Sequence, residues 1–545
     1  MAQFITAKKA AELIEDNWTV GIDAFIGFCL ADDILGEIEG RFVETGHPKN
    51  LSVLNVAGIG GDGKDRGINH FAHKGLMRRF LCSNLSLANK MYPLIMNDEV
   101  PTYMIPQGVL SHMMRAVQSG MPGVITRVGM KTFVDPRVDG GRINRAASEL
   151  PEEDAYNVEL IEVKGEEFLY YPVVPLDACI IKGSFADEDG NISIEKEAIH
   201  IEQYEMAAAT RNAGGKVFVQ VDEKVPEGAI HPQKVAVPAN MVDYVIVGKP
   251  ENTGQHFIDE FKNEETGLYE PLATWCGDER IHLEEMKPME FGLNKIICRR
   301  GLFEIHKGDF INLGIGISMD VSAVLNEEGR IDEISSSVES GIIGGVPAPG
   351  IATGAAYNPT AILKQPDIFD FYDGGGIDFA ALGAAEIDKH GNVNVSRFAG
   401  KVTGPGGFIN ISQGAKTVCF MGTFTAGLRD SDIRIENGGL NIVKDGKYKK
   451  FVDQVDHITF SGENSIDKNR REQASGGFGQ RVLFITERAV FELTEKGVML
   501  TEIAPGVDLE RDILGQMDFR PLIADDLKLM DERLFRPDKM NIDLK

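Results

Sequence analysis

Short apolar runs alternate with longer amphipathic stretches along most of the chain. The runs are rich in β-branched residues and end at glycine or polar residues, which predicts buried β-strands. The clearest are LSVLNVAG (51–58), DACIIKGSFA (177–186), KVFVQVD (216–222) and DYVIVG (243–248). IEKEAIHIEQYEMAAATRNAGG (194–215) has helical spacing and ends on a glycine pair. This alternation predicts an α/β fold with mostly parallel sheets flanked by helices.

One part of this pattern occurs twice, at an offset of about 200 residues. DACIIKGSFADEDGNISI (177–194) and DFAALGAAEIDKHGNVNV (378–395) both begin with Asp and carry Asp at the eleventh place. Both then continue with Gly-Asn and an aliphatic residue, which predicts a strand, a turn at Asp-Gly or His-Gly, and a second strand. A further apolar run follows each copy at nearly the same distance. We infer an internal duplication.

The length of 545 residues exceeds what one hydrophobic core normally supports, so two domains are expected. We place them at residues 1–275 and 290–545, each a mostly parallel sheet flanked by helices. The linker is expected within 250–290, where the sequence is polar, acidic and weakly periodic. Residues 294–316 predict a helix leading into a strand that ends in Gly-x-Gly, and residues 505–535 predict two terminal helices.

The net charge of −27 and the pI of about 4.9 exclude a typical nucleic-acid-binding protein, which needs a basic face. An anionic substrate needs a local basic patch, and residues 126–145 are locally basic, although a solvated loop explains them as well. No run of about 18 apolar residues and no signal-peptide core is present, so we expect a cytoplasmic protein without membrane spans. The six cysteines are too scattered for a disulfide framework or a zinc ribbon.

A glycine-rich loop, GIGGDG (58–63), follows a predicted strand and matches the dinucleotide fingerprint G-x-G-x-x-G. That fingerprint requires an uninterrupted helix and then an acid about 20 residues on, but Gly67 and Gly75 interrupt the helix and no acid lies in 67–96. A phosphate-binding P-loop requires Ser or Thr where Asp65 stands. An NAD-dependent oxidoreductase therefore stays the rival from another class.

Two further motifs suggest metal binding only weakly. His70 and His73 have H-x-x-H spacing but no third ligand nearby in the sequence, so packing is the better interpretation. ADEDGN (186–191) lacks the first aspartate of a calcium loop, because Phe185 stands there, and it predicts an ordinary turn.

The stretch SSSVESGIIGGVPAPG (335–350) holds a single charged residue, Glu339. IDEISSSV (331–338) predicts a strand that ends at the glycines after Glu339. The carboxylate therefore lies at the carboxyl end of a strand, where α/β folds build active sites. An ionised Glu there is ready to attack an electrophile. A charge that caps a turn is the alternative, but the apolar, glycine-rich continuation is atypical of a surface turn.

Two other stretches offer hydrogen-bond donors for a developing oxyanion. GPGGFINISQGA (404–415) presents backbone N–H groups at its glycines, and Gln107 follows a predicted strand end and precedes an amphipathic helix. Taken singly, each stretch is more often an ordinary turn.

In this order, the three stretches resemble class I CoA-transferases, in particular the single-chain acetate/propionate CoA-transferase branch. The resemblance covers nearly the whole chain and includes the motifs IPQGVLSHMMR, MPGVITRVGMKTFVDPR, INLGIGI, SSVESGIIGGVP and GPGGFINISQGAK. Many relatives have Ser-Glu-Asn-Gly at the glutamate, whereas this chain has Val338-Glu339-Ser340-Gly341, as in the acetate/propionate branch. The supporting role of that Asn is therefore not carried over.

The resemblance implies two fused CoA-transferase domains and a role for each motif residue. Glu339 corresponds to the catalytic glutamate and Gln107 to an oxyanion donor. Gly404, Gly406, Gly407 and Phe408 correspond to the CoA-binding motif, with Gly406 or Gly407 supplying the second oxyanion donor.

The expected activity is transfer of CoA between a short-chain acyl-CoA and a free acid, by ping-pong catalysis through a glutamyl-CoA thioester. The resemblance implies CoA as a substrate, no metal, no permanently bound cofactor, and a homotetramer or larger homo-oligomer. A non-catalytic module that binds CoA esters without exchanging them is a third interpretation.

Overall fold

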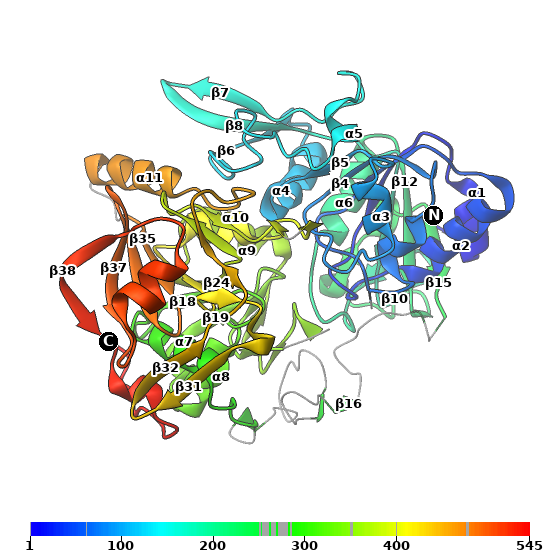
Figure 1. Ribbon diagram of the computed structural model, residues 1–545. Helices are drawn as coiled ribbons and strands as arrows, with labels where there is room; N and C mark the ends of the chain where they lie inside the picture. The colour runs from blue at the N-terminus through cyan, green and yellow to red at the C-terminus, as the bar shows by residue number, and fades with distance from the viewer. Residues whose placement is uncertain are drawn as a thin grey trace.

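The computed structural model describes residues 2–249 apart from Asp62, residues 252, 261, 262, 269, 270, 282 and 283, and residues 286–545 apart from 349–351, 399 and 476–478. Most of the linker predicted within 250–290 therefore lies outside the described residues. Within them, two large sheets lie side by side, one built from the first half of the chain and one from the second (Figure 1).

The first sheet has eight strands, and every neighbouring pair in it is parallel. Its order is β1 (Gln3–Phe4), β15 (Tyr244–Val247), β12 (Lys216–Val221), β9 (Ala178–Lys182), β2 (Thr19–Ile22), β3 (Leu51–Leu54), β4 (Met77–Cys82) and β5 (Thr102–Met104). The central strands are almost entirely buried, because helices cover both faces of a parallel sheet and leave room for uninterrupted apolar runs.

The second sheet has ten strands and is parallel at its centre, with antiparallel pairs towards both edges. Its order is β23 (Ala361–Ile362), β20 (Ile342–Ile343), β19 (Ser335–Ser337), β18 (Phe310–Leu313), β24 (Phe379–Gly383), β29 (Thr417–Met421), β35 (Arg481–Ile485), β36 (Ala489–Thr494), β37 (Gly497–Ile503) and β38 (Leu522–Leu529). The predicted α/β fold with mostly parallel sheets flanked by helices is confirmed.

The repeated sequence segments adopt the same structure. Strand β9 pairs in parallel with β12, and β24 pairs in parallel with β29. Asp187 accepts hydrogen bonds from the backbone N–H groups of the turn that follows β10 (Phe185–Ala186), and from the side chain of Asn191. Asp388 and Asn392 form the corresponding contacts after β24 and β25 (Glu386–Asp388). This equivalence supports an internal duplication.

The helices that matter for the site lie where the two halves meet. Helix α4 (Gln107–Gln118) packs against α6 (Gln203–Asn212) of its own half and against α9 (Gln365–Asp373) of the other half. Helix α10 (Phe408–Gly414) packs on α9, so α4, α9 and α10 lie together between the sheets (Figure 1). The remaining longer helices are α1 (Ala7–Leu13), α2 (Asp32–Thr45), α3 (Met91–Met96), α7 (Leu293–Leu302), α8 (Asp320–Glu327) and α11 (Gly462–Ser475).

Three predicted elements differ from the structure. The tail 505–535 forms short helical turns at Leu509–Gln516 and then strand β38, because Pro521 favours an extended chain before it and the segment pairs with β37. The helix predicted over 194–215 is limited to α6. The strand predicted over 331–338 is limited to β19, because residues 331–333 form a single helical turn.

Candidate active site

The structure brings together the three stretches that the sequence singled out. Glu339 directly follows β19, Gln107 begins α4 after β5, and the glycines 404–407 precede α10. The backbone N–H of Gln107 donates to the carbonyl of Gly406 at 3.0 Å. A Cβ added to Gly407 would lie 3.4 Å from Cγ of Glu339, and one added to Gly406 would lie 3.7 Å from Oε1 of Gln107. Adjacent glycines therefore lie next to the candidate nucleophile and the candidate amide donor.

The start of α4 is fixed to α10 by a second contact. The backbone N–H of Gly108 donates to Oδ1 of Asn410 at 3.1 Å. A Cβ on Gly108 would lie only 2.4 Å from Nδ2 of Asn410 and 2.6 Å from Phe369, so only glycine fits there. The sequence interpretation quoted Asn410 within its glycine-rich stretch but assigned it no role. A signal for that role was its place in the first turn of a helix after a glycine motif.

Most backbone N–H groups of the glycine motif are already hydrogen-bonded. The N–H of Gly404 donates to Ser396, that of Gly406 to Ser83 at 2.9 Å, and that of Phe408 to Pro405. In this structure the N–H of Gly406 is therefore already engaged by Ser83. The N–H of Gly407 has no backbone acceptor within the described part of the chain.

Glu339 is half-buried, and burial raises the pKa of its carboxyl group, although a hydrogen bond from its own backbone N–H partly offsets this rise. Among the described residues, no ion pair includes Glu339. The strand before it is held by side chains: Ser337 donates to the carbonyl of Ile311, and the Tyr372 hydroxyl donates to Ser337, both at 2.8 Å. The carboxylate thus lies on a fixed support, incompletely hydrated and without a counter-ion, which favours nucleophilic attack.

The side chain of Gln107 is 3% exposed, and its Nε2 donates to Oε1 of Gln365 at 3.2 Å. An amide nitrogen carries two hydrogens, so one N–H of Gln107 is left for another acceptor. Gln365 begins α9 and belongs to the other half of the chain. No local sequence pattern predicts this contact, because the two residues are 258 positions apart.

The other motifs have structural explanations. His70 and His73 bind opposite carboxylate oxygens of Glu39 at 2.6 and 2.7 Å. Within the described ranges, no cluster of three or more His, Cys, Asp or Glu side chains is arranged to hold a metal ion. Gly60 of the glycine-rich motif packs tightly, since a Cβ added to it would lie 2.2 Å from the carbonyl oxygen of Leu87.

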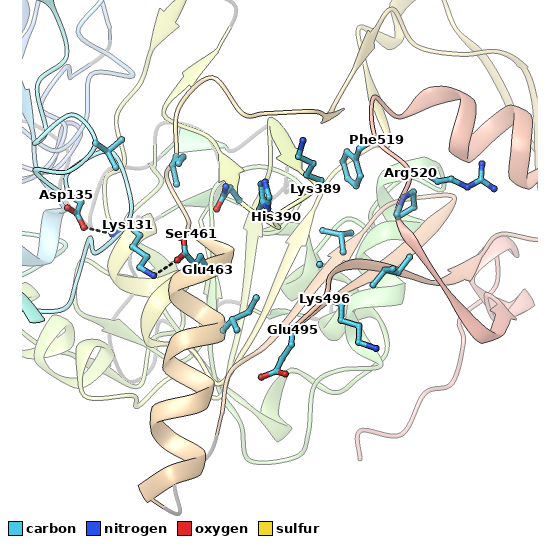
Figure 2. A pocket seen from close by; sticks show the side chains of 18 of the residues that line it. Lys131, Asp135, Lys389, His390, Ser461, Glu463, Glu495, Lys496, Phe519 and Arg520 are labelled. Carbon is cyan, nitrogen blue, oxygen red and sulfur yellow. Dashed lines mark hydrogen bonds and ion pairs between the residues drawn. The ribbon is translucent and has the colours of Figure 1, made fainter. Parts of the chain in front are cut away.

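Three of the basic residues of segment 126–145 form ion pairs with acidic neighbours. Lys131 binds Glu463 at 2.7 Å, Arg137 binds Asp135 at 2.7 Å, and Arg127 pairs with Glu166. Figure 2 shows Lys131 and Glu463 at the edge of a cavity of about 800 Å³.

Neither Glu339 nor Gln107 lines the cavities of about 800, 860 and 780 Å³ in the described part of the chain. No helix of the described residues is long and apolar enough to cross a membrane.

The chain is similar to known proteins over most of its length. The family described as Coenzyme A transferase matches residues 5–248. The chain is 39% identical over 543 residues to a caffeate CoA-transferase of Acetobacterium woodii, with 98% of each chain covered. It is 38% identical over 536 residues to the acetate CoA-transferase YdiF of Escherichia coli K12, with 97% of this chain and 94% of that protein covered.

A crystal structure of the acyl-CoA transferase YdiF apoenzyme from E. coli O157:H7 matches all of this chain and 98% of its own, with a TM-score of 0.87 and 36% identity. A second structure of that enzyme, a thioester complex with CoA, gives a TM-score of 0.86 at the same identity and coverage. The chain therefore belongs to the coenzyme A transferase family. It is a CoA-transferase, and its fold is that of the solved YdiF enzyme.

Proposed function

We propose that this enzyme transfers CoA between a short-chain acyl-CoA and a free carboxylic acid through a glutamyl-CoA thioester on Glu339. The observation that carries the proposal is the placement of Glu339 beside Gly407. A half-buried carboxylate lies next to Gly407, and among the described residues this carboxylate has no ion pair and the Gly407 N–H has no backbone acceptor. The solved CoA thioester complex of YdiF supports CoA as the substrate.

In the first half-reaction, an oxygen of Glu339 attacks the thioester carbon of the acyl-CoA. The carbon–sulfur bond breaks, and a mixed acyl-glutamyl anhydride and CoA thiolate result. The thiolate then attacks the glutamyl carbonyl carbon, and the carbon–oxygen bond to that carbon breaks. The first acid leaves as a carboxylate carrying one oxygen from Glu339, and the enzyme holds CoA as a thioester.

In the second half-reaction, an acceptor carboxylate attacks the glutamyl thioester and the same steps run in reverse. Both attacking groups are already anions, so the reaction needs no general base. Each tetrahedral intermediate carries an oxyanion, which we assign to the N–H groups of Gly407 and Gln107. Gly404, Gly406, Gly407 and Phe408 are proposed to form the wall that contacts CoA and keeps water from the thioester.

Acetate and propionate are the proposed acids, a homotetramer or larger homo-oligomer is the proposed assembly, and a cytoplasmic location stays a prediction. We also propose that residues 1–275 and 290–545 are two similar domains fused in one chain. The matching turns at Asp187 and Asp388 support this division.

Incubation with acetyl-CoA alone tests the mechanism. The enzyme should gain the mass of one CoA minus one water, located by peptide mass spectrometry on Glu339, and should release one equivalent of acetate. Addition of propionate should remove the adduct and yield propionyl-CoA. An enzyme that exchanges CoA between acids without this adduct would contradict the covalent route.

The raised pKa of Glu339 predicts a displaced acid limb in the pH profile. Only the ionised carboxylate attacks, so the rate falls as pH falls through a pKa above the ordinary 4.5 of glutamate. The measurement is the dependence of kcat/KM for acetyl-CoA on pH, with enzyme integrity checked at each pH. A rate constant that stays at its neutral-pH value down to about pH 4.5 would contradict the assigned environment.

A further inference from the structure

A row of buried polar side chains leads from Gln107 away from the proposed reaction centre. Nε2 of Gln107 donates to Oε1 of Gln365 at 3.2 Å, and Nε2 of Gln365 donates to both carboxylate oxygens of Glu202, at 3.0 and 3.2 Å. Ser111 lies one helical turn after Gln107 on α4 and also donates to Glu202. All four side chains are at most 3% exposed, so bulk water does not compete for these hydrogen bonds.

The chemistry of these groups gives the row a direction. An ionised carboxylate only accepts hydrogen bonds, so Gln365 must turn its NH₂ group towards Glu202 and its carbonyl oxygen towards Gln107. Gln107 must then offer its own NH₂ group to that carbonyl oxygen. A rotated Gln365 would set its carbonyl oxygen against the carboxylate, which is costly in a buried site. One negative charge therefore selects the orientation of two amides.

Hydrogen bonds from Ser111 and Gln365 favour the charge on Glu202 over the neighbouring acid Asp23. Asp23 is 1% exposed, and neither of its carboxyl oxygens receives a hydrogen bond within the described residues. Burial and the charges of Glu202 and Glu205 raise the pKa of Asp23 well above its ordinary value, whereas burial raises the pKa of Glu202 to about 7. Asp23 thus holds a proton when Glu202 is ionised. Glu205 is paired separately with Lys364 at 3.1 Å.

We propose that Glu202 and Gln365 are positioning residues that hold the amide of Gln107 in the orientation that leaves one N–H for the oxyanion. Neither residue touches the reacting atoms, and both act through Gln107. The proposal rests on the proposed function, because it assumes that Gln107 donates to the oxyanion formed by attack of Glu339.

Single substitutions test the row at about pH 8, where Glu202 is ionised. In Glu202→Gln, the new amide presents either its oxygen or its NH₂ to Gln365, so both amides lose their fixed orientation. We expect kcat for CoA transfer from acetyl-CoA to propionate to fall about 10- to 100-fold, less than the 10²–10³-fold typical for outright loss of an oxyanion donor. KM for acetyl-CoA should change little. Gln365→Glu should be impaired as well, because it places two carboxylates side by side.

The double variant Glu202→Gln/Gln365→Glu separates positioning from packing. The exchanged pair reverses the donation between positions 202 and 365 but keeps the donation from Gln107: the amide at 202 donates to the carboxylate at 365, and that carboxylate accepts from Gln107. We expect kcat to return to within about threefold of wild type, which a purely structural role does not predict. A double variant as slow as the slower single variant would overturn the proposal, as would wild-type kcat in Glu202→Gln.

Glu205→Gln is the matched control, a nearby buried acid that faces Lys364 instead of Gln365, and it should keep kcat near wild type. The acid limb assigned to Glu339 should persist in Glu202→Gln. The CoA adduct on Glu339, measured in wild type, is an independent test of the proposed function. If it forms and Glu202→Gln behaves as wild type, only the positioning inference fails; if it does not form, the proposed function itself fails.

Discussion

Replacement of Glu339 by alanine is expected to reduce CoA transfer by about 10⁴- to 10⁶-fold, as is typical when a covalent nucleophile is removed. No acid adjacent in the sequence can substitute, because SSSVESGIIGGVPAPG contains no other charged residue. Exchange of CoA between acetyl-CoA and labelled propionate measures the loss, and the CoA adduct should disappear with it. The alanine variant should still bind acetyl-CoA, because the glycine wall is unchanged.

Glu339→Gln distinguishes lost chemistry from lost folding. A folded-state pKa raised above the unfolded value means that the ionised carboxyl group destabilises the fold at neutral pH. Glu339→Gln removes that charge, so Tm at pH 7 should stay equal or rise while transfer is lost.

Glu339→Asp should retain slow thioester hydrolysis, since water can enter the space left by the missing methylene. Glu333→Ala, which alters an acid paired with Arg330 at 2.8 Å, serves as the control and should remain active. Full transferase activity in Glu339→Ala would refute the assignment.

Replacement of Gln107 by alanine is expected to lower kcat about 10²- to 10³-fold, because one of two oxyanion donors is lost while the nucleophile remains. KM for acetyl-CoA should change only a few-fold, since the lost interaction forms mainly in the transition state. Steady-state kinetics with acetyl-CoA and propionate give both values. The backbone N–H of Gln107 still donates to Gly406 in the variant, so the start of α4 keeps its position.

The control is Gln118→Ala, the same change at the other end of α4, which should leave kcat unaltered. A Gln107→Ala enzyme with wild-type kcat would show that the Gly407 N–H alone stabilises the oxyanion. A large rise in KM at constant kcat would instead show that Gln107 binds the substrate and the transition state equally.

Much of the fold was readable from the sequence because its signals are local. The runs at 51–58, 177–186 and 216–222 became strands of the parallel sheet, since uninterrupted apolar runs are what two helix-covered faces require. The prediction of two terminal helices over 505–535 was wrong, because the local signal there was missing. Strand β38 lies at the edge of its sheet and is mostly exposed on both sides, so its composition carried no strand signal.

The candidate site was likewise only partly predictable from the sequence. The absence of other charges around Glu339 pointed to it directly, and the structure adds its burial and its contact with Gly407. Local sequence did not reveal which glycine N–H lacks a backbone acceptor among the described residues. The N–H of Gly406 donates to the carbonyl of Ser83, which lies more than 300 residues away in the sequence. The same holds for the contact between Gln107 and Gln365, which joins separate halves of the molecule.

The packing of α4 and α10 against α9 has a consequence for the two halves of the chain. In the proposed assignment, one half contributes the amide and the other contributes the acid and the glycines, which gives each polypeptide one complete reaction centre rather than two. If the inferred duplication is ancestral, its two copies are complementary instead of redundant. A mutation that inactivates either copy cannot be compensated by the other, and full-length chains should be titrated at one equivalent of CoA each.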